Sequence, residues 1–436
     1  MKRRTFLRLA GVAAVPFIIP TRVFGQTAPS RRLNVGSIGS GNQWRGHCDF
    51  VLGNPNLQLT WICDVDAEHT KQNVDKIQDR YAKDSGMSSY KGVKTTDDYR
   101  ELLADKDLDI VWICTPDHWH ALPAILAAQS GKHIYVEKPL ARTVAEGRAM
   151  VNAVQRSGVV CQVGCQQRSG WEFQRAITLT QNGALGKIKT VRVGLPGGGG
   201  DRGIKQIVAE PIPDGFNYQM WLGPTPNVPY MKKRIHWDWR WNYNYGGGQL
   251  TDWINHHYDI AQLALGVSEQ APVAIKNAQA EFGDSPLYDT ASKYSFEAHY
   301  ANGQVIEVSS SGCFNGRGGV YIEGEKGWIW TDRGRIEYSS PALQNMALAS
   351  DGYTFLGKSS DHRQNFIDAV MNGTTSRAPI RHAYFTALAA HLANAAFRAG
   401  ISELKWDPAT ERVTNSADAE RFMAPNYRGP WTLPNA

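Results

Sequence analysis

LNVGSIGSG at residues 33–41 is the stretch that decides the fold expected for this chain. A β-type run ends there at Gly39 and Gly41, and a helix-compatible stretch follows at residues 45–52. Glycines at such a turn let the backbone approach a pyrophosphate, and the next helix offers free N–H groups and a partial positive charge. We therefore predict a strand, a phosphate-binding turn and a helix. Because Trp44 replaces the third glycine of the usual motif, an ordinary tight turn is the alternative.

Asp64 extends this stretch to a prediction about a cofactor. It follows an expected strand at residues 57–63 and lies where dinucleotide-binding proteins place a ribose-binding acid, roughly 20 residues after the glycines. A carboxylate there accepts hydrogen bonds from both ribose hydroxyls and repels a 2′-phosphate, so NAD is favoured over NADP. The alternative is that Asp64 only caps a helix expected at residues 66–83.

Strands and helices continue to alternate as far as residue 163. Further strands are expected at residues 109–114, 133–136 and 159–163, and further helices at residues 96–104, 119–130 and 143–157. This alternation predicts an α/β fold with a doubly wound parallel sheet, in an N-terminal domain that covers residues 31–165. Ligands bind at the carboxyl ends of such strands, where four candidate residues fall: Thr115, His120, Glu137 and Gln166.

The second half of the chain has a pattern typical of an antiparallel sheet. Strands are expected at residues 188–193, 292–299, 305–311, 320–324 and 327–331, and helices at residues 360–372 and 381–399. Residues from 406 onward show little periodicity and are expected to form packed coil. We assign residues 166–400 to a second domain and residues 401–436 to a tail that packs on the body.

The segment at residues 236–243 is rich in aromatic residues and includes Trp239, Arg240 and Tyr243. Aromatic faces beside polar groups suit sugars, whose C–H faces stack while their hydroxyls form hydrogen bonds. For each tryptophan, core packing or an oligomer interface is the alternative. Asp252 and His256 follow on an expected helix, where residues four apart share one face and point at the same ligand.

Residues 1–25 have the pattern of a twin-arginine export signal, with the pair Arg3-Arg4 followed by an apolar run at residues 9–20. The run is too short for a bilayer span, so we expect no stable membrane anchor and a periplasmic or otherwise exported protein. A disordered basic tail is the alternative. Five of the six net positive charges lie in these residues, so the remainder is nearly neutral and no nucleic-acid partner is expected.

The six cysteines show no CxxC pair and no spacing with histidine that would form a zinc site. We therefore predict no metal site. Export of a folded protein from a reducing cytoplasm favours buried thiols. Cys161 and Cys165 are the only close pair, and a disulfide between them is an open but less favoured alternative.

Five separated motifs resemble one family in order and spacing: residues 36–41, 63–64, 115–120, 137–139 and 252–259. They are similar to the Gfo/Idh/MocA oxidoreductases, the group of glucose-fructose oxidoreductase and inositol dehydrogenase, and the leader resembles the exported branch. The resemblance implies a Rossmann domain followed by an α/β domain. The open, mainly antiparallel sheet of that second domain often builds oligomer contacts, so we expect a homo-oligomer.

The resemblance also assigns roles to single residues. Lys138 matches the active-site lysine beside the nicotinamide, and Asp252 and His256 match a substrate-binding pair in which the histidine accepts a proton. A neutral imidazole is a suitable base for a hydroxyl proton. The expected cofactor-binding residues are Gly39, Gly41, Asn42, Asp64, Thr115, His120, Glu137 and Gln166. The expected substrate-binding residues are Arg168, Trp239, Arg240 and Tyr243.

These residues lead to three hypotheses about function. The first is an NAD-dependent oxidoreductase acting on a sugar or polyol, with its cofactor tightly bound and recycled because an exported enzyme meets no reliable dinucleotide pool. The alternative is an NAD-dependent glycosidase, which oxidises C3 transiently, eliminates the aglycone, adds water and reduces the ketone. A sugar- or NAD-binding module that has lost catalysis is the third, but Lys138, Asp252 and His256 are all present and disfavour it.

Overall fold

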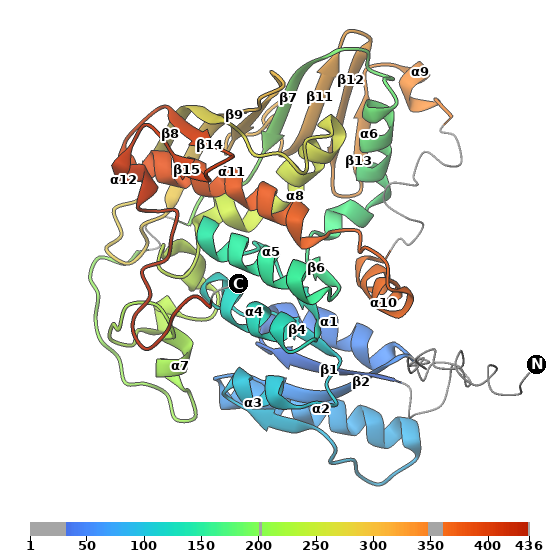
Figure 1. Ribbon diagram of the computed structural model, residues 1–436, viewed down its shortest axis with the longest axis vertical. Coiled ribbons are helices and arrows are strands. Elements are labelled where there is room, and N and C mark those ends of the chain that lie inside the picture. The colour runs from blue at the N-terminus through green and yellow to red at the C-terminus, as the bar shows by residue number, and fades with distance from the viewer. Residues whose placement is uncertain (1–31, 200–202, 348–360, 435–436) are drawn as a thin grey trace, which may run out of the picture.

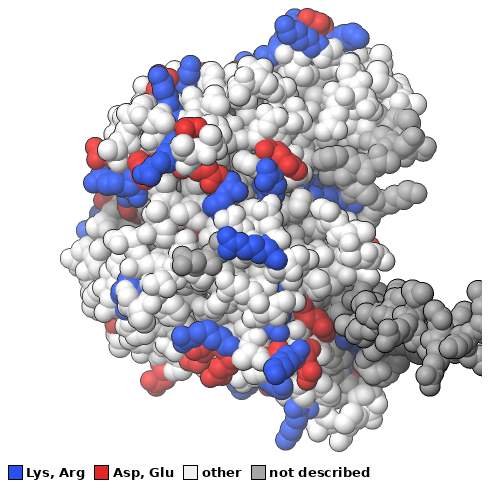
Figure 2. Space-filling view, in the orientation of Figure 1, with Lys and Arg blue, Asp and Glu red and all other residues white. Residues whose placement is uncertain are grey.

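The computed structural model describes residues 32–199, 203–347 and 361–434, arranged around two β-sheets (Figure 1). The expected export signal at residues 1–25 lies outside the described residues. Basic and acidic side chains are interspersed over the face shown in Figure 2. Among the described residues, no helix is both long enough and apolar enough to cross a membrane.

The first sheet has six parallel strands in the order β3-β2-β1-β4-β5-β6. This is the strand order of a doubly wound fold, as predicted, and ligands of such sheets bind where the order reverses between β1 and β4. Its strands are β1 Leu33–Ile38, β2 Leu57–Cys63, β3 Lys94–Thr96, β4 Ile110–Ile113, β5 His133–Val136 and β6 Cys161–Val163.

Helices on both faces cover this sheet. They are α1 Asn42–Gly53, α2 Ala67–Ser85, α3 Tyr99–Ala104, α4 Ala121–Gln129 and α5 Val144–Ser157. One expectation was wrong here, because residues 94–96 pair with β2 as an edge strand and the helix predicted from residue 96 begins only at Tyr99. Asp98 sets that start by accepting a hydrogen bond from the amide of Arg100.

The second sheet has nine strands in the order β13-β12-β11-β7-β10-β9-β8-β14-β15. Its neighbours are antiparallel except β7 and β10, so the mainly antiparallel sheet is confirmed. Its strands are β7 Ile188–Gly194, β8 Ala274–Phe282, β9 Ala291–His299, β10 Val305–Ser309, β11 Gly319–Gly324, β12 Gly327–Asp332, β13 Arg335–Tyr338, β14 Leu404–Asp407 and β15 Arg412–Val413.

Three helices pack on this sheet: α6 Trp171–Gln181, α8 Gly248–Leu265 and α11 Ile380–Ala399. Helix α11 is buried along nearly its whole length, because it contacts both β8 in the second sheet and α5 on the first domain (Figure 1). A helix that is apolar on all sides is stable only when it is enclosed in this way. The two domains are therefore joined through a shared apolar core.

The C-terminal part of the chain does more than the expected coil. Helix α10, His362–Asn372, returns to the first domain and packs Phe366 against Trp112 and Tyr135. Strand β14 adds to the second sheet beside β8, and a short helix, α12 Ala417–Glu420, follows. The packed-coil expectation for residues 406–436 was therefore wrong at β14 and β15, which pair through their backbones, and at α12.

A long segment at residues 203–241, which we call the strap, crosses from the second domain to the first. It contains one short α-helix, α7 Tyr218–Leu222, and two 3-10 helices, Lys232–Arg234 and Asp238–Trp241. The backbone of Asn217 donates to Val65 O at 2.8 Å, and that of Ala67 donates to Gly215 O at 2.9 Å. These bonds fasten the strap to the loop that follows β2, and so place it over the carboxyl ends of the parallel strands.

All six cysteines lie in the described part of the chain and are free thiols. Burial raises the pKa of Cys161 and Cys165 well above the ordinary thiol value. The structure therefore shows two unreactive buried thiols at the one position where a disulfide was an open alternative.

Candidate active site

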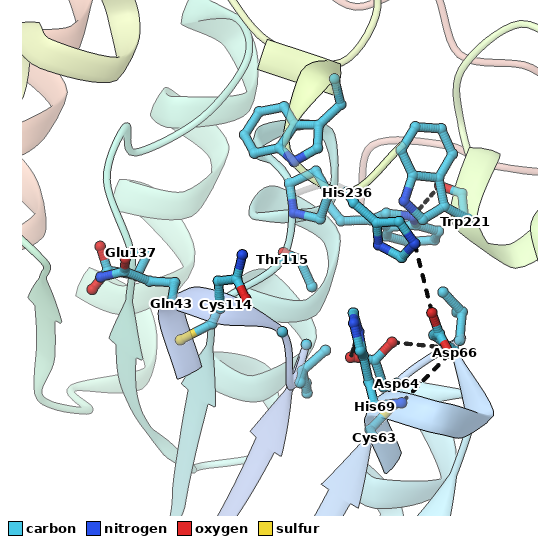
Figure 3. Close-up of a pocket in the computed structure, with 18 of the residues that line it drawn as sticks. Gln43, Cys63, Asp64, Asp66, His69, Cys114, Thr115, Glu137, Trp221 and His236 are labelled. Carbon is cyan, nitrogen blue, oxygen red and sulfur yellow. Dashed lines mark hydrogen bonds and ion pairs between the residues drawn. The ribbon is translucent and has the colours of Figure 1, made fainter. Parts of the chain in front are cut away.

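A cavity of about 360 Å³ lies at the carboxyl ends of the parallel strands, between the first domain and the strap (Figure 3). Its volume falls in the range of small-molecule sites. Seven predicted cofactor or catalytic residues and two predicted substrate residues line it: Gly39, Gly41, Asn42, Asp64, Thr115, Glu137, Lys138, Trp239 and Arg240. The strap adds Phe216, Met220, Trp221, His236 and Trp237.

The glycine turn at the start of α1 has the form that a pyrophosphate requires. Gly39 has a φ of +82°, and a Cβ at this position would lie 2.8 Å from the carbonyl carbon of Cys114. Gly41 is the N-cap of α1 without a side-chain cap, so the first amides of the helix remain available to an anion. Trp44, at the third motif position, is fully buried against Trp112 and leaves the turn open.

Asp64 is held at the rim of this cavity as a carboxylate. Its Oδ2 accepts hydrogen bonds from the amide and hydroxyl of Ser40 at 2.6 and 2.9 Å. Burial alone would raise the pKa of Asp64, but hydrogen bonds from His69 and Ser40 outweigh it and hold the pKa below its ordinary value. The cap of α2 is Asp66 instead, so the alternative role for Asp64 as a helix cap is excluded.

Glu137 and Thr115 offer further polar groups at the strand ends. Glu137 Oε1 lies 2.8 Å from His47 Nε2 and accepts from Gln166 Nε2 at 3.0 Å. Burial would raise the pKa of Glu137, but His47 and Lys138 hold it low. Thr115 Oγ1 is buried without a hydrogen-bond partner among the described residues, which suits a polar ligand in the cavity.

His120 does not line the cavity, although we predicted a cofactor contact. Its Nδ1 lies 2.7 Å from Pro139 O and its Nε2 lies 2.9 Å from Thr115 O. Both ring nitrogens are therefore engaged with the backbone of the two strand-end loops. The prediction is corrected to a positioning role beside the cis peptide bond between Lys138 and Pro139.

Lys138 and Asp252 bring the two domains together beside the cavity, which Lys138 lines but Asp252 and His256 do not. Lys138 Nζ donates to Asp252 Oδ1 at 2.8 Å and to the Asp252 carbonyl at 3.0 Å. Arg240 Nε, from the strap, lies 3.5 Å from the same carboxylate oxygen. Burial would raise the pKa of Asp252, but these two cations keep it below the ordinary value.

His256 lies one turn after Asp252 on α8, as the four-residue spacing predicted. Its side chain is buried, and Nδ1 has no hydrogen-bond partner within the described residues. Burial, followed by the charge of Lys138, lowers the pKa of His256 well below its ordinary value. This lowered pKa favours the neutral imidazole, the form that can accept a proton.

Arg168 and Tyr243 are not part of the cavity, so their predicted substrate contacts are corrected. Arg168 is fully buried and forms a two-bond pair with Asp259, at 2.6 Å and 2.5 Å. Tyr243 packs against the guanidinium groups of Arg142 and Arg398. Both residues have structural partners that direct their side chains away from the site.

Several residues near the site, besides the aromatic and apolar residues of the strap, were not among the predicted site residues. Gln43, His69, His236 and Trp237 line the cavity. Asp117 is buried near Asp252, where burial and that carboxylate raise its pKa well above the ordinary value. Asp117 lies inside the motif at residues 115–120, and Gln43 follows the motif at residues 36–41 by two positions, so both positions offered a signal. His69 and His236 meet only through the fold.

Comparisons with known proteins agree with this geometry. Residues 33–165 match the GFO_IDH_MocA model described as "Oxidoreductase family, NAD-binding Rossmann fold", and residues 179–433 match the family's "C-terminal alpha/beta domain". The uncharacterized oxidoreductase YrbE of Bacillus subtilis is 27% identical over 314 residues, which cover 70% of this chain and 75% of that protein.

Two further relatives are similar to this chain over shorter stretches. Levoglucosan dehydrogenase of Pseudarthrobacter phenanthrenivorans is 33% identical over 168 residues, which cover 37% of this chain and 40% of that protein. Glycosyl hydrolase family 109 protein 1 of Shewanella sp. (strain MR-4) is 33% identical over 167 residues, which cover 38% and 36%. Each alignment thus spans less than half of the relative.

The structure of GenD2 from gentamicin A biosynthesis, in complex with NAD, shares the fold, with a TM-score of 0.60 at 20% identity. The match covers 88% of this chain and 98% of that one. With both family models matched along almost the whole described chain, the protein belongs to the Gfo/Idh/MocA oxidoreductase family and has an NAD-binding Rossmann domain.

Proposed function

We propose that the protein is an NAD-dependent oxidoreductase that acts on a hydroxyl group of a sugar or polyol and keeps its cofactor between turnovers. The observation that carries this proposal is the 2.8 Å contact between Lys138 Nζ and Asp252 Oδ1. It joins the strand-end loop after β5 to α8, beside His256 and next to the cavity. The residues proposed to transfer the proton thus lie next to the residues proposed to hold the cofactor.

The residues of the chain divide the work of the reaction. NAD, when held by the residues that line the cavity, would supply the acceptor for a hydride from the substrate carbon and the donor that restores it. Lys138 donates a hydrogen bond to the oxygen of the reacting hydroxyl, while Asp252 fixes the ammonium group in place. His256 is neutral and takes the hydroxyl proton, since its buried imidazole has an unpaired nitrogen. Glu137, Thr115 and the glycine turn hold the cofactor.

Carbohydrate specificity rests on the aromatic side of the cavity. The guanidinium of Arg240 lies 4.3 Å from the ring centre of Trp237 and 4.5 Å from that of Trp239. These groups offer flat faces and directional donors beside Asp252, the combination that suits sugar rings. The similarity to levoglucosan dehydrogenase supports the same substrate class.

Retention of the cofactor follows from the strap and from the proposed export. The strap roofs the cavity and is fastened to the loop after β2, which favours a slowly exchanging cofactor. The twin-arginine pattern of residues 1–25 supports export of the loaded protein. A retained cofactor must be restored within the site, so two half-reactions have to be coupled. We further propose a homo-oligomer whose contact is the face of the second sheet opposite α6, α8 and α11.

A second candidate is an NAD-dependent glycosidase, supported by the similarity to family 109 glycosyl hydrolase proteins. Oxidation of the C3 hydroxyl makes the C2 proton acidic, a base removes it, and the aglycone leaves from C1. Water then adds at C1, C2 regains a proton, and the hydride returns to C3, so the net reaction is hydrolysis. This route needs one more acid than simple hydride transfer, and buried Asp117 near Asp252 is a suitable one.

Incubation of the purified protein with glycosides and free sugars, without added NAD, distinguishes the candidates. The oxidoreductase is expected to produce a keto sugar only when a second sugar is reduced in equal amount. Release of aglycone without an accumulated ketone would establish the glycosidase instead. Lys138→Ala and His256→Ala serve as controls, and unchanged turnover in both variants would show that the assigned site is wrong.

A further inference from the structure

We propose that Asp66, His69 and His236 form a binding site for a divalent transition-metal ion at the rim of the cofactor cavity. One ligand atom of each residue lies within 4.8 Å of the others. Figure 3 shows the two imidazole rings and the Asp66 carboxylate gathered on one side of the cavity. Cysteine spacing had led us to expect no metal, but this site uses no cysteine and draws on residues far apart in the sequence.

The distances describe a site that closes on an ion by small movements. His236 Nε2 lies 3.7 Å from Asp66 Oδ2, and the ring centres of His69 and His236 are 5.2 Å apart. Metal bonds of about 2.0–2.2 Å place neighbouring ligand atoms roughly 3.3 Å apart in a tetrahedral site. The His236 side chain is 45% exposed and is therefore free to make most of this adjustment.

Two elements position the three ligands, helix α2 and the strap. Asp66 caps α2 through Oδ1, which leaves Oδ2 for a metal. His69 lies in the first turn of the same helix. His236 comes from the strap and has a φ of +54°, a left-handed conformation that a residue other than glycine rarely adopts. Such a conformation is characteristic of functional positions held by their surroundings.

Asp64 supplies the second layer of contacts that metal-binding histidines generally have. Its Oδ2 lies 3.6 Å from His69 Nδ1, so Nε2 is the nitrogen left for the metal. A carboxylate behind an imidazole fixes its orientation and makes it a stronger ligand. Two nitrogens and one carboxylate oxygen select Zn²⁺, Co²⁺, Ni²⁺ or Cu²⁺ over Mg²⁺ and Ca²⁺, and three protein ligands leave one position open.

The consequence is a metal-dependent closure of the cavity. An ion held by these residues would tie the strap to α2 beside Asp64, where the cofactor ribose is expected. Opening the strap would then require breaking a metal bond, so cofactor exchange would become slower. This closure rests on the proposed retention of the cofactor, whereas metal binding itself does not depend on the reaction.

The test uses the whole protein after treatment with a chelator and desalting. Titration with Co²⁺ followed by visible absorption, and with Zn²⁺ followed by native mass spectrometry, is expected to show one ion per chain. Asp66→Asn, His69→Asn and His236→Asn should each weaken Zn²⁺ binding by about tenfold or more, the least that loss of a supporting group costs such sites. Asparagine keeps the helix cap at residue 66 and tolerates the left-handed backbone at residue 236.

His299→Asn is the matched control, because His299 pairs with Glu297 on β9 and lies outside the cluster. It should bind Zn²⁺ as the parent protein does. No binding, or equal binding in all four variants, would overturn the site. Exchange of bound NADH, followed by its fluorescence, should be slower with Zn²⁺ in the parent but not in His236→Asn, and equal rates would overturn the closure. Neither measurement uses sugar turnover, so failure of the proposed function would be seen separately.

Discussion

Lys138 Nζ lies 2.8 Å from Asp252 Oδ1, although the two residues belong to different domains and are separated by 114 positions in the chain. Lys138 is the second residue of the loop after β5, and Asp252 lies in the first turns of α8. The contact fixes the two domains at the place where hydride and proton transfer are proposed to occur. Chemistry at this site therefore depends on the packing of the domains as well as on the residues themselves.

Lys138→Met should lower kcat by about a hundredfold or more, because it removes the hydrogen-bond donor to the reacting hydroxyl while keeping the length of the side chain. The glycine turn and Asp64 are unchanged, so NADH binding, measured by fluorescence, should stay close to that of the parent. A variant with full kcat would show that the lysine does not take part in the reaction.

The activity should stay constant through neutral pH and fall only in acid. The pKa of His256 is held well below its ordinary value of 6.5 by burial and by Lys138, so the imidazole remains the neutral base as the pH falls through 6.5. The rate of substrate oxidation, measured from pH 5 to 8, should therefore begin to fall only below pH 6.5. A fall in rate centred at or above pH 6.5 would contradict the assignment of His256 as the base. In His256→Asn this fall in rate should disappear along with most of the activity.

Arg168→Met should destabilise the protein without a specific effect on substrate binding. The pair with Asp259 is fully buried, and removing one partner of such a pair costs about 3–5 kcal/mol. Urea unfolding measures this loss, and KM of the remaining folded enzyme should be unchanged. Arg240→Met is the comparison, since it should raise KM while leaving the free energy of unfolding nearly unchanged. The opposite result would restore Arg168 as a substrate ligand.

Asp64→Asn should shift cofactor preference from NAD toward NADP. The carboxylate is the group expected to bind both ribose hydroxyls and to repel a 2′-phosphate. Its loss should weaken NADH binding by about 10–100-fold, the range for charge-assisted hydrogen bonds, and should strengthen NADPH binding. Fluorescence titration measures the dissociation constants of both cofactors and so tests this shift in preference. Equal losses for the two cofactors would mean that Asp64 only supports the loop.

The fold could be predicted where local patterns are strong, and failed where they are broken. The glycine turn at Gly39 and the alternation up to residue 163 gave the first sheet almost completely. Strand β8 escaped notice because Asn277, at a φ of +51°, lies in a register shift that interrupts the two-residue period. The tail strands are four and two residues long, too short to carry a pattern of their own.

The site was predictable where residues directly follow strands, and not where it depends on tertiary packing. Asp64, Thr115, Glu137 and Lys138 line the cavity because parallel strands end at one edge. Arg168 was misassigned because it lies two residues after Gln166, but the intervening 3-10 turn directs it to Asp259. The meeting of His69 with His236 depends on the path of the strap, which no local pattern encodes.

The strap is held down by a residue that comes late in the chain. The amide of Arg428 donates to Pro224 O at 2.8 Å, and its guanidinium donates to Gly223 O at 2.9 Å. The strands of both sheets are synthesised before this residue, because the last strand ends at Val413. The contacts that fasten the roof of the cavity are therefore added after both sheets in chain order, and the cavity is less covered in any shorter nascent chain.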